Sequence, residues 1–272
     1  MIKLSYVLPD PQSYKIWTEF EDDLACVKRT GYDGVELQIA DPADQNLPQL
    51  ARALNNAGLS LCAFQSGGTY ASRGNCLSTA DAAVRERTLQ VLERHIDFAG
   101  SFEPSVGGHA RIVLGSLQGA RREERDQDAG QTRIMEALVR IGRYATTRGV
   151  TLAFEPVNHE EIGWHNTIAA AAATVRHLAE PGLQLMVDTF HMNIEERDML
   201  APLAEVADLL VHVHLSETNR DVLGEGHWPT LEFFRELERI GYKGFCSIGV
   251  YNTRRTRREC ITHCMQRIRG IE

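Results

Sequence analysis

The stretch LQLMVDTFHMNIEE (residues 183–196) decides the fold class of this 272-residue chain. A short apolar run ends in Asp188, a polar turn carries His191, and acidic residues open the next segment. An apolar run of this length between polar residues is typical of a strand buried on both faces of a parallel sheet. A carboxylate at the end of such a strand is costly to bury unless a cation or hydrogen bonds offset the cost. Asp188 therefore marks a candidate site.

Two neighbouring segments repeat this design. Residues 150–155 (VTLAFE) end in Glu155, and residues 209–214 (LLVHVH) end in His214. Three successive strands would therefore bring Glu, Asp and His to one mouth. Oxygen ligands with one imidazole suit Mn²⁺, Mg²⁺ or Co²⁺, and Zn²⁺ is an alternative. A single strand-end carboxylate can instead be a helix cap, but three such groups together favour a metal site.

Strand and helix signals alternate eight times along the chain, without a linker, a low-complexity tract or a break in composition. The predicted strands are residues 2–8, 35–39, 59–64, 111–115, 150–155, 183–188, 209–214 and 245–250. The predicted helices are residues 16–29, 47–57, 80–100, 134–148, 168–179, 195–207 and 231–240, followed by a terminal helix. This alternation predicts an α/β fold, a (β/α)8 TIM barrel with one domain over residues 1–272. The rival fold is an open doubly wound sheet, but no Gly-rich nucleotide fingerprint follows the first strand.

Bulk composition narrows the function classes. The net charge of −8 gives no support for nucleic-acid binding, which usually needs a basic face. The six cysteines form no CxxC pair, and several fall inside predicted elements, which favours a reducing compartment over a disulfide framework. The first apolar run is too short for a signal peptide, and no stretch approaches membrane-spanning length. We therefore expect a cytoplasmic protein without membrane contact, and a homo-oligomer stays open.

Three polar residues fall in the loops after the ligand-bearing strands: Glu161, His191 and Arg220. They are candidates for substrate contacts, although His191 could satisfy a loop carbonyl and Arg220 could be a surface charge. His212 shares a strand face with His214 and is expected deeper in the barrel. Three aromatic residues fit either an apolar wall under a sugar ring or the core. They are Trp164, Phe190 and Trp228.

Three strings carry a resemblance to a known family. They are FEPVNHEE (154–161), MVDTFHMNIEE (186–196) and HVHLSETNRDVLGEGHWP (212–229). The chain resembles the xylose-isomerase-like TIM-barrel superfamily of sugar phosphate isomerases and epimerases, and within it the D-tagatose/D-psicose 3-epimerase group. The first half agrees in its strand–helix rhythm and in phrases such as GYDGVEL.

The resemblance implies roles for six residues. Glu155, Asp188 and His214 would be ligands of a divalent metal, usually manganese, and Glu155 would also be the acid/base residue. The substrate's carbonyl and hydroxyl end would be held by Glu161, His191 and Arg220.

One position departs from the family pattern. The pattern needs a second glutamate at the end of the last strand, in a phrase close to MEPF, but this chain reads CSIGVYN (246–252) with Gly249 at that place. No residue in 245–252 carries a carboxylate, so Glu217 is a candidate to fill the space. One remaining base, Glu155, can still move a proton on a single face, as in aldose–ketose isomerisation. A decarboxylation or elimination that forms the enediolate by losing another group would need even fewer acid/base residues.

The leading hypothesis is a divalent-metal-dependent isomerase or epimerase that acts on a small keto-sugar through an enediolate. One alternative is a lyase or decarboxylase that uses the same metal site on an oxidised sugar acid. Another is a non-catalytic relative that has lost the fourth ligand. The acidic balance and the lack of a histidine-rich, three-metal ligand set disfavour a nuclease of the same superfamily. The substrate's identity and phosphorylation, the metal and the oligomeric state stay open.

Overall fold

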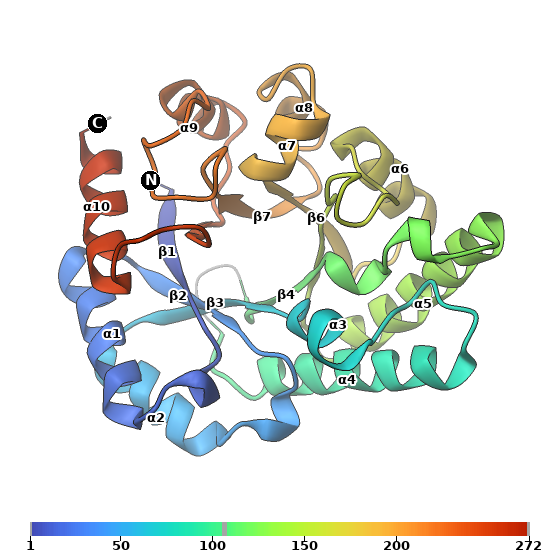
Figure 1. The fold of residues 1–272 in the computed structure, drawn as a ribbon, viewed down its shortest axis with the longest axis horizontal. Helices are drawn as coiled ribbons and strands as arrows, with labels where there is room; N and C mark the ends of the chain where they lie inside the picture. The colour runs from blue at the N-terminus through green and yellow to red at the C-terminus, as the bar shows by residue number, and fades with distance from the viewer. Residues whose placement is uncertain (1, 105–107, 271–272) are drawn as a thin grey trace.

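Eight parallel strands close into a barrel in the computed structural model, which describes residues 2–104 and 108–270. The strands pair in chain order, and β8 pairs with β1 to close the ring (Figure 1). The strands are β1 (Lys3–Leu8), β2 (Gly34–Gln38), β3 (Ser60–Gln65), β4 (Arg111–Leu114), β5 (Leu152–Phe154), β6 (Leu183–Asp188), β7 (Leu210–Leu215) and β8 (Phe245–Ile248). The predicted TIM barrel is confirmed.

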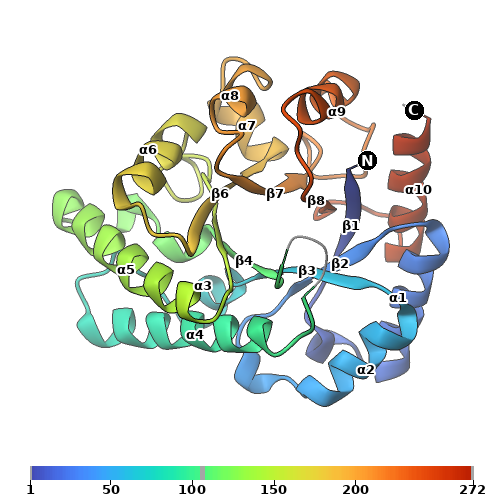
Figure 2. The same ribbon diagram turned by 180° about the vertical axis from the view of Figure 1, so that it is seen from behind.

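Helices surround the strands, as the view from behind also shows (Figure 2). They are α1 (Trp17–Thr30), α2 (Leu47–Ala57), α3 (Gly68–Arg73), α4 (Ala82–Gly100), α5 (Gln127–Thr147), α6 (Ile168–Leu178), α7 (Thr189–Glu195), α8 (Ala201–Glu205), α9 (Thr230–Arg239) and α10 (Arg257–Arg269). Local signals set their ends. For example, α10 begins with a capping box between Thr256 and Glu259, and α1 stops at Gly31, whose φ of 105° is left-handed. Within the described residues, no helix is long and apolar enough to cross a membrane.

The predicted helix over residues 195–207 is wrong. The chain instead forms α7, which starts directly after β6, and the separate α8. The Asp188 carboxylate accepts a hydrogen bond from the backbone N–H of Phe190 at 2.8 Å, so Asp188 is the N-cap of α7. Pro202 lies in the first turn of α8. Because a proline inside a helix lacks an N–H and clashes with the preceding turn, one helix through both segments would break there.

The interior of the barrel positions the site. The main core lies between the strands and the helices, and a separate cluster of six buried apolar side chains lies among the strands. Its members are Cys62, Ala63, Val113, Ala153, Met186 and Phe245. Side chains two apart on a strand share a face. Glu155 and Asp188 therefore continue the inward rows that begin at Ala153 and Met186, and reach the carboxyl end of the barrel.

Candidate active site

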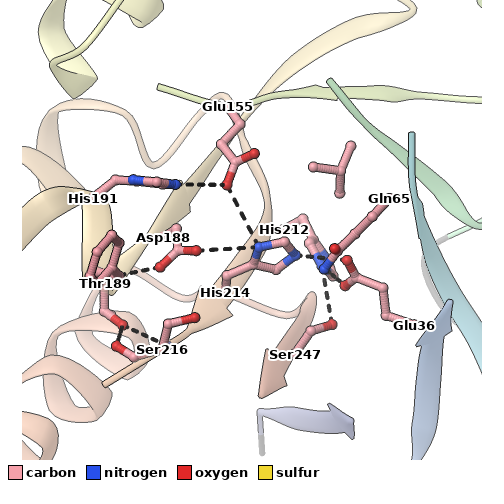
Figure 3. Close-up of polar contacts among 12 residues, drawn as sticks. Glu36, Gln65, Glu155, Asp188, Thr189, His191, His212, His214, Ser216 and Ser247 are labelled. Atoms are coloured by element: carbon pink, nitrogen blue, oxygen red, sulfur yellow. Dashed lines mark hydrogen bonds and ion pairs between the residues drawn. The ribbon is translucent and has the colours of Figure 1, made fainter. Parts of the chain in front are cut away.

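Three buried side chains from consecutive strand ends, Glu155, Asp188 and His214, meet His191 of α7 at the mouth of the barrel (Figure 3). His214 Nδ1 lies 3.7 Å from Glu155 Oε1 and 3.6 Å from Asp188 Oδ2. His191 Nε2 lies 3.8 Å from the same Glu155 oxygen. We call Glu155, Asp188 and His191 the mouth group, because all three face His214 or the cavity beside it. The three strand-end residues that the sequence marked as candidate ligands therefore lie together.

A cavity of about 130 Å³ opens beside these side chains. Its lining includes every site residue that the sequence analysis named: Glu155, Glu161, Asp188, His191, His214 and Arg220. Gln65 and Tyr251 also line it, and neither was predicted. The sequence motifs thus converge on one pocket at the carboxyl ends of the strands, where TIM-barrel active sites lie.

The other nitrogen of His214 faces a closed polar network, which we call the inner layer: Ser5, Glu36, His212 and Ser247. Glu36 accepts hydrogen bonds from His214 Nε2 at 2.8 Å and from His212 Nε2 at 2.7 Å. Ser247 Oγ lies 3.1 Å from His212 Nε2 and 2.7 Å from Ser5 Oγ. Because Nε2 of His214 gives its hydrogen to Glu36, Nδ1 is the nitrogen that faces the cavity. His212 lies deeper in the barrel, as expected.

The two sides of His214 titrate differently. Burial, reinforced by the charge of Asp188, raises the pKa of Glu155 to about 8 although His214 lies close. Burial acts on Glu36 in the same direction, but His214 and His212 outweigh it and hold the pKa of Glu36 well below its usual range. Burial is likewise outweighed at His214, where Glu36 and Asp188 raise the pKa well above its ordinary value. Without a cation, a proton on His214 therefore lies between the two mouth carboxylates.

The donor atoms fit a divalent metal. Ligands about 2.1 Å from one ion lie about 3 Å or slightly more from one another, close to the spacing between His214 Nδ1 and the two carboxylate oxygens. Two carboxylates and one imidazole are a suitable set for Mn²⁺, Mg²⁺, Co²⁺ or Zn²⁺. Glu36, His212 and His214 also lie close together. Their atoms are already hydrogen bonded at 2.7–2.8 Å, which leaves no room for an ion between them.

His191 is oriented as a neutral hydrogen-bond donor. Asn158 Nδ2 donates to His191 Nδ1 at 2.7 Å, so the ring's own hydrogen sits on Nε2 and points toward Glu155. Burial lowers the pKa of His191, which keeps the ring uncharged at neutral pH. A substrate oxygen in the cavity would therefore meet an N–H at this position.

Arg220 forms the outer wall of the cavity. Its Nη2 lies 3.1 Å from Glu161 Oε1, and its guanidinium group stacks 3.9 Å from the centroid of the Phe190 ring. The backbone of Arg220 has a φ of 59°, in the left-handed region that non-glycine residues seldom adopt. Its carbonyl accepts hydrogen bonds from the backbone N–H groups of Tyr251 and Asn252, both at 2.9 Å. These contacts hold Arg220 in this conformation.

The structure resolves the open choices for three aromatic residues. Trp164 and Trp228 belong to the main hydrophobic core. Phe190 instead lies under Arg220 at the site. Among the described ring contacts, only those of Phe190 link one of these three aromatic residues to the lining of the cavity.

Glu217 does not fill the space left by the fourth ligand. Its carboxylate accepts hydrogen bonds from the backbone N–H groups of Thr218 and Gly224, at 2.9 and 2.8 Å, and thereby holds the loop after β7. It is not among the described residues that line the cavity. The expectation that Glu217 could take the place of the missing glutamate is therefore wrong. Among the described residues that line the cavity, none after β8 carries a carboxylate.

Sequence reasoning missed Glu36, Gln65 and Tyr251. Glu36 had a usable signal, because a charged residue in the middle of a strand buried on both faces requires a partner. Gln65 stands at the carboxyl end of β3, where site residues are expected. Tyr251 had no such signal, since it follows β8 in a loop and reaches the cavity through the conformation of that loop.

The chain is similar to known sugar epimerases. A ketose 3-epimerase of Arthrobacter globiformis is 31% identical over 217 residues, which are 80% of this chain and 72% of the relative. An L-ribulose 3-epimerase of Mesorhizobium japonicum is 31% identical over 83% of this chain and 73% of its own. A 3-dehydro-D-guloside 4-epimerase of Escherichia coli is 26% identical over 80% of this chain and 82% of its own.

Structure comparison and family comparison agree. A solved structure of an L-ribulose 3-epimerase superposes with a TM-score of 0.83 at 25% identity, and the match covers 100% of this chain and 94% of that one. The family model described as "Xylose isomerase-like TIM barrel" matches residues 24–268, nearly the whole chain. The resemblance that the sequence motifs carry is thereby confirmed, and the chain belongs to the xylose isomerase-like TIM barrel family.

Proposed function

We propose that the chain is a divalent-metal-dependent epimerase or isomerase of a small keto-sugar that works through an enediolate. The observation that carries the proposal is the convergence of the buried Glu155, Asp188 and His214 Nδ1 on one cavity at the mouth of the barrel. The relatives named as ketose and L-ribulose 3-epimerases support the substrate class.

The cation would be held by Glu155, Asp188 and His214. Manganese is the first ion to test, with Mg²⁺, Co²⁺ and Zn²⁺ beside it. When bound, such an ion polarises a substrate carbonyl and so acidifies the neighbouring C–H bond. The position of His214 Nδ1, which faces the cavity while Nε2 is bound to Glu36, and the two buried carboxylates beside it support this assignment.

The chain's own residues would then carry the proton transfer. The Glu155 carboxylate is placed to take the proton from the carbon beside the substrate carbonyl, which leaves an enediolate. The Nε2–H of His191 would donate a hydrogen bond to a substrate oxygen. Arg220 and Glu161, paired at 3.1 Å on the cavity wall, would bind substrate hydroxyl groups.

A second function, a lyase or decarboxylase acting on an oxidised sugar acid, is favoured by one observation. Gly249 leaves the β8 side of the cavity without the second carboxylate that two-sided proton transfer by glutamates would need. Loss of CO₂ leaves the C–C electron pair on the carbon beside the carbonyl, and so generates an enediolate without a base on that side. The relative named for a 3-dehydro sugar makes 3-oxo sugars a reasonable part of any substrate screen.

The test is a substrate screen with the metal-loaded protein in D₂O. L-Ribulose, D-psicose, 3-oxo glycosides and 3-oxo sugar acids are each incubated, while deuterium uptake, epimer formation and released CO₂ are measured. We expect deuterium uptake and a new epimer or isomer from a keto-sugar, both abolished by a chelator and restored by Mn²⁺. Release of CO₂ from a sugar acid without deuterium exchange of ketoses would establish the lyase instead. Sugar binding without any turnover would indicate a non-catalytic relative.

A further inference from the structure

Residue 249, directly after β8, is a glycine at a position where a side chain would point into the barrel. Phe245 lies in the apolar cluster inside the barrel, and Ser247 lies in the inner layer. Because inward residues recur at every second position of a strand, residue 249 also faces inward. A Cβ atom on Gly249 would lie 2.6 Å from Cε2 of Tyr251 and 2.7 Å from its hydroxyl oxygen. The hydroxyl end of Tyr251 therefore occupies the place where an inward side chain of residue 249 would begin.

Several contacts fix Tyr251 in this place. Gln65 Nε2 donates to the Tyr251 hydroxyl at 3.1 Å, and Gln38 Nε2 donates to Gln65 Oε1, also at 3.1 Å. The guanidinium group of Arg220 lies 5.4 Å from the Tyr251 ring centroid. The Tyr251 residue is still 42% exposed and lines the cavity, so a substrate can contact it. Because the hydroxyl accepts from Gln65, its own hydrogen is available to a substrate.

Tyr251 and Glu155 reach the cavity from well-separated strands. Glu155 follows β5 and Tyr251 follows β8, and the two intervening strands deliver Asp188 and His214. A sugar that contacts all four residues would therefore have Glu155 on one side and Tyr251 on another.

We propose that Tyr251 is a catalytic residue, the proton donor on the β8 side of the substrate, in place of an acidic side chain at position 249. This inference rests on the proposed function. It would let a chain with a single active-site glutamate at the strand ends keep the two-sided chemistry that epimerisation requires, and so favours epimerase over isomerase.

The proposed epimerisation moves two protons, one from the substrate to Glu155 and one from Tyr251 to the substrate. The Glu155 carboxylate takes the proton from the carbon beside the carbonyl, the C–H electron pair forms the C=C bond, and the carbonyl π pair moves to oxygen. The Tyr251 hydroxyl then gives its proton to the opposite side of that carbon, where the C=C pair forms the new C–H bond and the carbonyl reforms. The tyrosinate regains a proton from water, and protonated Glu155 gives its proton to water.

The experiment compares Tyr251→Phe with the wild type in D₂O, both loaded with Mn²⁺. Mass spectrometry follows deuterium in the starting ketose, and chromatography follows the epimer. We expect Tyr251→Phe to retain deuterium uptake, because Glu155 still exchanges the proton on its own side, while epimer formation falls about 100-fold. Tyr144→Phe, which removes a hydroxyl of α5 that donates to Asp97 and does not line the cavity, should leave both rates unchanged. Epimer formation at the wild-type rate, or equal loss of both rates, would overturn the proposal, as would a wild type that exchanges deuterium but forms no epimer.

A binding measurement separates this proposal from the proposed function. Calorimetry with the polyols xylitol and D-mannitol should show about fivefold weaker binding to Tyr251→Phe, because one hydrogen bond is lost, and an unchanged affinity for Mn²⁺. If the wild type takes up no deuterium from any sugar, the proposed function fails, and these titrations decide Tyr251 alone. Equal polyol affinities, or no polyol binding by either protein, would then remove Tyr251 from the substrate site.

Discussion

The imidazole of His214 lies between two polar regions that are built in opposite ways. On its Nε2 side, the inner layer is closed, with Glu36 hydrogen bonded to two histidines at 2.7 and 2.8 Å. On its Nδ1 side, the mouth group is open, and its carboxylate oxygens stay 3.6 and 3.7 Å from the ring nitrogen. Both regions contain a buried carboxylate, but the carboxylate of the inner layer is hydrogen bonded to the histidine rings beside it, whereas those of the mouth group lie farther from His214.

The difference lies in which polar atoms are already satisfied. Glu36 is fully buried, but its partners hold its pKa well below the usual range, so it stays charged and fixed. At Glu155, burial itself, with the charge of Asp188 added to it, raises the pKa to about 8, because the nearby His214 does not outweigh it. Buried polar groups without close partners are costly, and they are kept where a ligand supplies the partner. We infer that the inner layer positions His214, and we propose that the mouth group contacts a cation and a substrate.

The largest expected effect comes from breaking the mouth group. Glu155→Gln keeps the size of the side chain but removes the base and one anionic ligand. We expect the epimerase or isomerase activity to fall about 1,000-fold, within the range for loss of a general base. Steady-state kinetics at saturating Mn²⁺ measure this effect. Glu136→Gln on the exposed face of α5 is the matched control, and equal activity of both variants would exclude Glu155 as the base.

Breaking the inner layer should act on folding and on metal affinity together. Glu36→Gln removes a buried charge that pairs with two histidines, which is expected to cost about 3 kcal/mol of unfolding free energy. Because Glu36 also orients His214, the affinity for Mn²⁺ should fall about 10- to 100-fold. Urea unfolding and metal titration measure the two effects. A variant with reduced stability but normal metal affinity would show that the inner layer does not position His214.

The raised pKa of Glu155 predicts that removing its charge stabilises the metal-free protein, whereas Glu36→Gln destabilises it. The folded protein binds a proton at Glu155 up to a pH of about 8, whereas the unfolded chain loses it near the ordinary pKa of a glutamate. Folding without metal therefore becomes less favourable as the pH rises between those two values. We expect metal-free Glu155→Gln to be about 2 kcal/mol more stable than the wild type at pH 8, with the difference shrinking toward pH 4.5. A difference that grows toward acid pH would contradict the assignment.

Metal binding should strengthen as the pH rises. Both Glu155 and His214 hold protons more tightly than usual in the metal-free protein, and a cation must displace them. The affinity for Mn²⁺ is therefore expected to rise about tenfold per pH unit for each proton released, between pH 6 and 8. Calorimetry in two buffers of different ionisation enthalpy counts the released protons. A constant affinity over this range, with no proton release, would place the ion elsewhere.

Much of this comparison could be predicted from the sequence, but unevenly. Glu155, Asp188 and His214 were identifiable because each ends a buried strand, and parallel strands gather their carboxyl ends at one face. The pairing of Glu36 with His212 and His214 joins residues 176 and 178 positions apart, so it depends on how the barrel closes. The position of Tyr251 depends on a loop conformation that no periodicity encodes. The helix predicted over residues 195–207 was wrong because the prediction followed the apolar pattern and disregarded Pro202, which interrupts a helix at that position.

One divalent cation, as we propose, binds between Glu155, Asp188 and His214. The most direct measurement is a crystal structure grown with Mn²⁺, with anomalous scattering recorded at the manganese edge. We predict a single strong anomalous peak within about 2.3 Å of a carboxylate oxygen of each acid and of His214 Nδ1. A peak at another site, or full manganese loading with no peak among these three side chains, would contradict the account.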